Sequence, residues 1–206
     1  MSASRRSRRT RGWSSVAAVY DRQLALERPA LRSLLTMLRI GVDEALLDVG
    51  TGTGGLLREL ATIAPRPKRA VGVDDSPQML ERAAPVPADW EMVAADAQRL
   101  PFAAASFDVA TATYLLHVLE PTVRAAVLAE IHRVLRPGGR VGLVTIAPPF
   151  ARLTWPLLRA FSAGAGPLAG LRPLDPAPDL LAAGFTISAR LPVRRGYPSL
   201  CVVGRR

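Results

Sequence analysis

The chain has 206 residues, of which 49% are hydrophobic and 5% aromatic, and it carries a formal net charge of +10. This length suits a single domain with a sizeable core. The single cysteine, Cys201, excludes an internal disulfide framework, and with only two histidines a Cys- or His-rich metal site is not expected. No apolar run reaches the roughly 18–20 residues that cross a bilayer, so we expect a cytoplasmic protein. The few cysteines and histidines lead us to expect no bound metal.

The first twelve residues form an Arg-rich tail that we expect to be disordered. Arg5, Arg6, Arg8, Arg9 and Arg11 supply five of the positive charges. This bias can reflect overall composition alone, or it can attract an anionic partner such as acidic lipid headgroups, nucleic acid or an anionic substrate. Both interpretations stay open from the sequence.

Residues 13–40 carry apolar side chains at helical spacing, which predicts an N-terminal helical cap over residues 13–44. Pro29 suits the first turn of a helix, so the pattern favours a second helix that begins there. Gly41 is the expected end of that helix.

From residue 45 the pattern changes to short apolar strands that alternate with helices. Three helices are predicted between these strands. The first follows the first strand and runs to about Ile63, and the second begins at the N-cap Ser76 with Pro77 in its first turn. The third covers Thr122–Leu135 and is expected to end at Pro137-Gly138-Gly139. Such alternation predicts a doubly wound α/β sheet that binds ligands at the carboxyl ends of its strands. The predicted strands are Ala45–Val49, Arg69–Val73, Trp90–Ala94, Phe107–Ala112 and Arg140–Ile146.

Residues 147–178 break this alternation and are rich in Pro, Gly and Ala. A helix is then expected over Asp179–Ala183. Two strands follow, one after Phe185 and one over Leu200–Val203. The short turn Gly196-Tyr197-Pro198 predicts that these two strands form an antiparallel hairpin.

The segment that follows the first predicted strand is rich in glycine. Gly50, Gly52 and Gly54 allow a tight turn and let a ligand approach the backbone, where side chains would block it. Gly50, Gly52 and Gly55 also satisfy the dinucleotide pattern G-x-G-x-x-G, so a dehydrogenase has to be weighed. Asp48, two residues before Gly50, favours a cationic ligand and would repel a pyrophosphate. No Lys-Ser/Thr pair follows, which excludes a Walker phosphate loop.

Five motifs occur in order, and together they resemble the class I S-adenosylmethionine-dependent methyltransferases, in particular the type 11 branch with quinone-biosynthesis and phospholipid enzymes. The resemblance covers about residues 45–146, which would be the cofactor-binding core. It implies a Rossmann-like, doubly wound, mostly parallel sheet of seven strands with an antiparallel last strand and helices on both faces. The motifs are Leu47–Gly54, Val71–Leu80, Ala95–Phe102, Ser106–Val109 and Arg133–Gly139.

The resemblance also implies which residues bind S-adenosylmethionine and its product S-adenosylhomocysteine. Asp48 and the Gly50–Gly54 backbone would hold the methionine part, and Asp74 would accept both ribose hydroxyls. Asp96 would bind the adenine amino group, with the Ala97 amide near a ring nitrogen. The implied cofactor-binding set is Asp48, Gly50, Thr51, Gly52, Gly54, Asp74, Asp75, Met79, Asp96, Ala97 and Thr113.

Methyl transfer needs alignment of the acceptor and exclusion of water more than it needs a catalytic triad. His117 is the candidate base, against the alternative of a structural histidine. Tyr20 is a candidate to close the site from the N-terminal helix, against the alternative of a buried helix-face tyrosine. Residues 147–178 would be an acceptor-side insertion or lid, with Trp155 and Phe161 on its apolar face, and residues 179–206 the final helix and strands.

The acceptor stays open. The main hypothesis is methylation of a small or amphipathic molecule by a monomer or homodimer. A phospholipid N-methyltransferase at an anionic membrane surface is an alternative, because the tail and the net charge suit such a surface. A nucleic-acid-binding protein is disfavoured, since Ala147-Pro148-Pro149-Phe150 lacks the amide or acid that would hold a base amine. A non-catalytic cofactor-binding protein also stays open.

Overall fold

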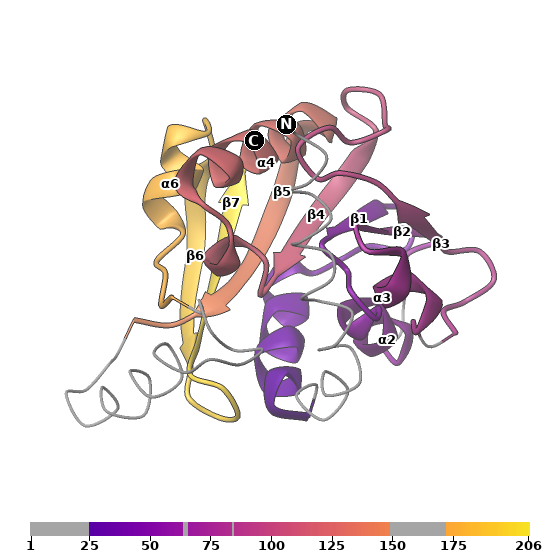
Figure 1. Ribbon diagram of the computed structural model, residues 1–206, viewed down its shortest axis with the longest axis horizontal. Coiled ribbons are helices and arrows are strands. Elements are labelled where there is room, and N and C mark those ends of the chain that lie inside the picture. Colours follow the sequence, from indigo (N-terminus) through magenta and orange to yellow (C-terminus); the bar gives the residue numbers. More distant parts are fainter. Residues whose placement is uncertain (1–24, 64–65, 84, 149–171) are drawn as a thin grey trace.

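The computed structural model of the chain describes residues 25–63, 66–83, 85–148 and 172–206. Seven strands form one sheet in the order β3-β2-β1-β4-β5-β7-β6 (Figure 1). The direction of the chain order reverses between β1 and β4, which is the switch point where such sheets bind ligands. The strands are β1 (Ala45–Val49), β2 (Arg69–Asp74), β3 (Glu91–Ala94), β4 (Phe107–Thr113), β5 (Leu135–Ile146), β6 (Thr186–Val193) and β7 (Ser199–Arg205).

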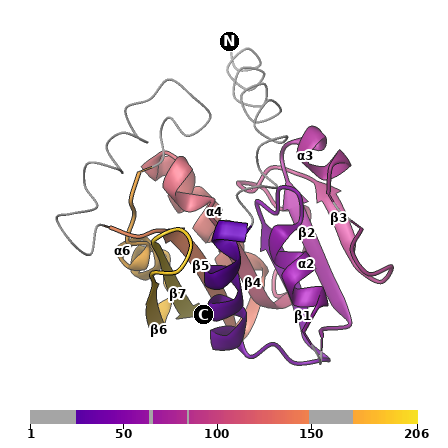
Figure 2. The ribbon, with the colours of Figure 1, turned by 90° about the horizontal axis from the view of Figure 1, so that it is seen from below.

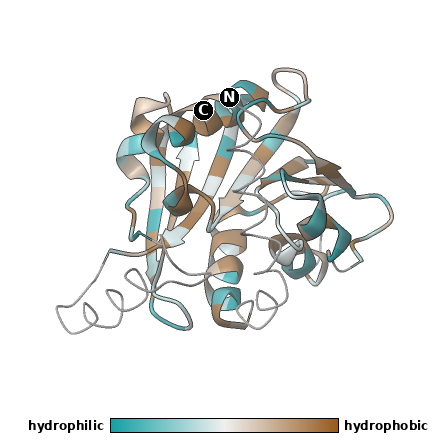
Figure 3. Ribbon diagram, in the orientation of Figure 1, coloured by the Kyte–Doolittle hydropathy of each residue, from teal (hydrophilic) through white to brown (hydrophobic). Residues whose placement is uncertain are grey.

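The direction of the strands confirms the predicted fold class. β1, β2, β3, β4 and β5 pair in parallel, whereas β7 is antiparallel to both β5 and β6. The last two strands therefore form the predicted antiparallel hairpin. The turn of this hairpin is hydrophilic, whereas many residues within the central strands are apolar (Figure 3).

Helices cover both faces of the sheet (Figure 2). On one face, a helix over residues 25–38 and α2 (Gly55–Ala61) bury leucines against β1, β4 and β7. On the other face, α4 (Pro121–Val134) and α6 (Ala177–Ala182) pack on the central strands. Two shorter elements, α3 (Pro77–Glu81) and the 3-10 helix η1 (Leu116–Val118), follow β2 and β4.

The N-terminal helix differs from its prediction at both ends. It already includes residues 25–28, so Pro29 does not lie in the first turn of a new helix. Proline only removes one helical hydrogen bond here, and the buried leucines that follow keep the helix packed on the sheet. The helix ends before Arg39, which adopts a left-handed φ of 49°. Gly41 therefore lies beyond the end of the helix, where its amide donates to the Glu44 carboxylate.

The end of α4 also differs from its prediction. Leu135 is already extended, with φ −71° and ψ 144°, and it pairs with Phe107 in the sheet. Pro137-Gly138-Gly139 therefore lies within β5, at a register shift, and does not end the helix. Regular pairing resumes at Arg140, where the fifth strand was predicted to begin.

Several predictions fall outside the described residues. They are the disordered tail with its five arginines, the role of Tyr20, and most of the lid with Trp155 and Phe161. None of the helices in the described ranges is long and apolar enough to cross a membrane.

Candidate functional site

The glycine loop follows β1 at the switch point of the sheet. Gly50 has φ 70°, and a Cβ on it would lie 2.9 Å from the Leu115 side chain, so this position requires glycine for both conformation and space. The Gly50 and Thr51 amides donate to the Val73 carbonyl at 2.8 and 2.9 Å. The loop is thus bound to β2 by its own backbone, and these amides are already used within the protein.

Asp74, at the end of β2, holds the loop from the other side. Its Oδ2 accepts a hydrogen bond from the Gly52 amide at 2.8 Å, and its Oδ1 accepts one from the Ser76 amide at 2.9 Å. Ser76 then caps α3 by accepting from the Met79 amide. Burial raises the pKa of Asp74. The Asp75 amide also lies close enough to lower this pKa, and because a carboxylate has about four acceptor sites, Asp74 can still accept a ligand hydroxyl.

Asp48 is a carboxylate inside the sheet. It is 1% exposed, and its Oδ1 accepts a hydrogen bond from the Thr111 hydroxyl at 2.7 Å. No hydrogen bond of ordinary geometry reaches its Oδ2 among the described residues, although the buried Thr51 hydroxyl lies close enough to lower the pKa of Asp48. Burial raises the pKa of Asp48 to about 6. A buried acid with a free oxygen suits a cationic ligand group.

A pocket opens beside the loop, at the carboxyl ends of β1, β2 and β3. It contains about 380 Å³ of empty space, including solvent at its mouth. Five of the predicted binding residues line it, and they come from three segments of the chain, which lie at the carboxyl ends of β1, β2 and β3. These residues are Gly50, Asp74, Asp75, Asp96 and Ala97.

The other predicted binding residues do not line this pocket. Thr51, Gly52 and Gly54 belong to the glycine loop, and Met79 belongs to α3. Thr113 is half-buried at the end of β4, and Asp48 lies below the loop. Among the lining acids, Asp96 also accepts a hydrogen bond from the Gln98 amide at 2.9 Å, which stabilises the turn after β3.

The sequence interpretation missed the apolar wall of the pocket. Leu115 and Leu119 come from the segment after β4, and Val123 and Val127 come from α4. Val123 and Val127 are spaced by four residues within α4, which places them on one helical stripe, whereas Leu119 is extended and precedes the helix. This spacing could have indicated the apolar wall from the sequence alone. A planar apolar ligand such as adenine suits a wall of this kind next to the polar groups of Asp96 and Ala97.

His117, the candidate base, lies in η1 and is 4% exposed. Its ring meets the Tyr114 ring edge-on, with 6.1 Å between centroids. Burial lowers the pKa of His117 to about 4, and its Nδ1 has no partner among the described residues. The imidazole is therefore neutral near pH 7 and a weak base there. Its catalytic role stays a prediction that this geometry does not favour.

These features fit a sulfonium cofactor better than a dinucleotide. The unpaired Asp48 Oδ2 offers a negative charge below the glycine loop, where a pyrophosphate would be repelled. Asp74 and Asp96 stand where a ribose diol and an adenine amine could be bound. Within the described ranges, no group of three or more His, Cys, Asp or Glu residues could hold a metal ion.

The comparison with known families agrees with this geometry. Residues 46–139, which run from β1 through the glycine loop to the start of β5, match a methyltransferase domain. The chain belongs to the class I S-adenosylmethionine-dependent methyltransferases. The chain has the seven-stranded sheet with its antiparallel last strand that the motifs implied.

Relatives of the chain act on different acceptors, as their names state. It is 36% identical over 129 residues to the ubiquinone/menaquinone biosynthesis C-methyltransferase UbiE of Desulfotalea psychrophila, covering 61% of this chain and 50% of the relative. It is 34% identical over 140 residues to the malonyl-[acyl-carrier protein] O-methyltransferase of Hahella chejuensis, covering 66% and 48%. The chain thus spans about half the length of these curated relatives.

Among solved structures, the methyltransferase is similar to 1,6-didemethyltoxoflavin-N1-methyltransferase of Burkholderia thailandensis, which holds its substrate and S-adenosylhomocysteine. The TM-score is 0.70 and the identity 26%, and the match covers 99% of this chain and 88% of that one. The similarity extends over the whole sheet and includes the hairpin beyond residue 139.

Proposed function

We propose that this chain transfers the methyl group of S-adenosylmethionine to a small or amphipathic acceptor. One observation carries the proposal: the buried Asp48 carboxylate has an oxygen without a partner in the described residues, below a glycine loop at the switch point of the sheet. An unpaired buried charge is costly unless a ligand compensates it. A cationic cofactor does so, and a pyrophosphate does not.

When bound, S-adenosylmethionine supplies an electrophilic methyl group on a positively charged sulfur. The protein's own residues would bind and orient it. Asp48 would face the positive end of the methionine part, and Asp74 would accept the ribose hydroxyls while it holds the Gly52 amide. Asp96 and Ala97 would contact the adenine. The apolar wall would exclude water from the reacting groups.

Titration calorimetry with S-adenosylmethionine, S-adenosylhomocysteine and NAD tests the cofactor. We expect both adenosyl ligands to bind and NAD not to bind. Tight binding of NAD with no response to either adenosyl ligand would overturn the proposal. A screen for acceptors by mass spectrometry, which looks for the mass gain of one CH2 group, then tests the transfer itself.

The acceptor class is part of the proposal. The relatives named above are a C-, an O- and an N1-methyltransferase, and a small acceptor gains support from two of these names, the quinone-biosynthesis enzyme and the didemethyltoxoflavin enzyme. None of these three is a phospholipid methyltransferase, and the membrane alternative gains no support from them. That alternative predicts salt-sensitive binding to anionic vesicles, driven by the net charge of +10.

A further inference from the structure

A second polar cluster lies at the same edge of the sheet as the glycine loop. Tyr114 follows β4 directly, and Ser199 begins β7 opposite Ile146, the last residue of β5. The Tyr114 and Ser199 hydroxyl oxygens are 2.7 Å apart. Because the carboxyl ends of parallel strands meet at one edge, this pair stands beside β4 and β5 on the far side of the switch point from Asp74.

The direction of the hydrogen bonds in this cluster follows from counting protons. The Ser199 hydroxyl donates its only proton to the Tyr197 carbonyl at 2.8 Å. The bond between the two hydroxyls must then be donated by Tyr114. Burial raises the pKa of Tyr114 well above its ordinary value, so the phenol stays protonated. Tyr114 therefore acts through the lone pairs of its oxygen, which can accept a hydrogen bond from a ligand.

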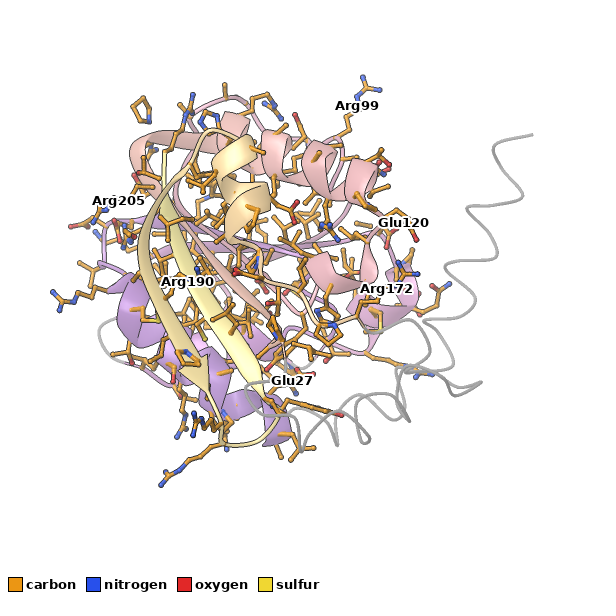
Figure 4. The ribbon with its side chains drawn as sticks, turned by 90° about the vertical axis from the view of Figure 1, so that its left-hand side faces the viewer. Glu27, Arg99, Glu120, Arg172, Arg190 and Arg205 are labelled. Carbon is orange, nitrogen blue, oxygen red and sulfur yellow. The ribbon has the colours of Figure 1, made fainter. Side chains whose placement is uncertain are left out.

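The N-terminal helix brings Glu27 to this cluster. The Leu26 carbonyl accepts a hydrogen bond from the Tyr197 amide at 3.0 Å, and the Ala30 carbonyl accepts one from the Cys201 thiol at 3.5 Å. These bonds place the helix against the start of β7. Burial raises the pKa of Tyr114 and of Tyr197, and the nearby charge of Glu27 raises both further. Figure 4 shows Glu27 within the outline of the molecule, whereas Arg99 projects from it.

Glu27 is a buried acid without a counter-charge. It is 6% exposed, and in the described part of the chain no cation forms an ion pair with it. Its neighbour Arg28 is bound to Glu59. Burial raises the pKa of Glu27 to about 7. An unpaired acid in a protein of charge +10 is an unusual arrangement, and such groups are candidates for function.

The backbone at Tyr114 is a separate indication. Tyr114 has φ 54°, a left-handed conformation that an aromatic residue rarely adopts. Its amide donates to the Val144 carbonyl at 2.7 Å, which fixes this conformation and directs the side chain toward Ser199. Strained residues of this kind gather at functional sites.

We propose that Glu27, with the Tyr114–Ser199 pair, forms the site that receives the methyl acceptor and removes its proton. This inference rests on the proposed methyl transfer. The acceptor would be a neutral molecule with an acidic hydroxyl or ring N–H. Its O–H or N–H bond breaks, the proton binds to a Glu27 carboxylate oxygen, and the electron pair stays on the acceptor, which becomes the nucleophile. The Tyr114 oxygen accepts a hydrogen bond from the same molecule and positions it.

Glu27 is the group in this cluster that would change charge near neutral pH. Tyr114 and Tyr197 are the titratable groups of the described elements that the charge of Glu27 reaches, and Cys201 and His117 lie close to Tyr114. Burial raises the pKa of both tyrosines and of the thiol, and it lowers the pKa of the imidazole. All four stay neutral near pH 7.

The first test is the titration of Glu27 itself, measured by infrared difference spectroscopy on the full chain loaded with S-adenosylhomocysteine. Subtracting the spectrum of Glu27→Gln isolates this carboxyl group. We expect its protonated band to disappear with a midpoint of about 7. A midpoint in the ordinary range of an exposed glutamate would overturn the proposal.

The second test uses pairs of acceptors that differ in one proton: phenols and ring N–H heterocycles, each against its methylated twin. With saturating S-adenosylmethionine, we expect methylation of protic compounds only. Glu27→Gln should lower kcat by about 100-fold and remove the rising limb of the pH profile near pH 7. Tyr114→Phe should raise KM more than it lowers kcat. Glu81→Gln, an exposed acid at the end of α3, serves as the matched control.

The outcomes separate the two proposals. If the chain does not bind S-adenosylhomocysteine, the proposed function itself fails. If the cofactor binds but no protic compound is methylated, or Glu27→Gln keeps the wild-type pH profile, only the assignment of Glu27 fails.

Discussion

The Asp74 carboxylate accepts a hydrogen bond of 2.8 Å from the Gly52 amide, which ties the end of β2 to the glycine loop after β1. The residue expected to hold the cofactor ribose is therefore also a structural residue of the loop. Loss of this side chain should affect both the fold and the ligand, and experiments have to separate the two effects.

For Asp74→Ala, we expect the free energy of unfolding to fall by about 1–3 kcal/mol, because the Gly52 and Ser76 amides lose their acceptors. We also expect affinity for S-adenosylhomocysteine to fall at least about tenfold. A 2′-deoxyribose analogue isolates the ligand contact. Wild-type protein should bind it more weakly than the parent compound, and Asp74→Ala should not distinguish the two. Equal discrimination by both proteins would disprove the ribose contact.

Asp48 predicts a pH dependence of cofactor binding. Its pKa is about 6 in the free protein, and a cationic ligand binds the ionised form better. Affinity for S-adenosylmethionine should therefore fall as pH drops below about 6, by about tenfold per pH unit if one proton is linked. Calorimetry over this pH range checks it. Asp48→Asn should flatten the dependence, and the same slope in both proteins would contradict the role of Asp48.

Gly50 and Gly138 offer a matched pair for testing the loop. Both have positive φ, 70° and 77°, but a Cβ on Gly50 would meet the Leu115 side chain at 2.9 Å, whereas nothing lies within 4 Å of one on Gly138. Gly138→Ala should cost about 1 kcal/mol from conformation alone. Gly50→Ala should cost about 1–3 kcal/mol more and weaken binding of S-adenosylhomocysteine. Equal losses in urea unfolding would show that space at Gly50 is unimportant.

His117 predicts how stability depends on pH. Its pKa is about 4 in the folded protein against an ordinary value of 6.5, so the unfolded chain binds its proton first as pH falls. The contribution is fully present above pH 6.5 and is lost as pH falls toward about 4, by up to about 3 kcal/mol. Urea unfolding should show a shallower loss in His117→Leu. His132→Gln, at the more exposed histidine, is the control and should keep most of the wild-type slope.

The sequence alone determined the alternation of strands and helices, the glycine loop and the acids at the strand ends. Ala45–Val49 was predicted with its observed bounds, and Ser76 caps α3 as expected. These features depend on local patterns, since apolar runs, capping residues and glycines act within a few positions of the chain. The resemblance of the five motifs added the number of strands, the antiparallel last strand and the type of cofactor.

Tertiary structure alone decided what these local patterns contact. Leu135 leaves the helix because it pairs with Phe107, and no signal near Pro137 shows this. Tyr114 meets Ser199 across 85 positions of sequence, and Glu27 reaches them from a helix at the other end of the chain. Contacts over such distances leave no periodic trace in one sequence. The cofactor loop was therefore readable from the chain, whereas the proposed acceptor site appeared only when the sheet brought its edges together.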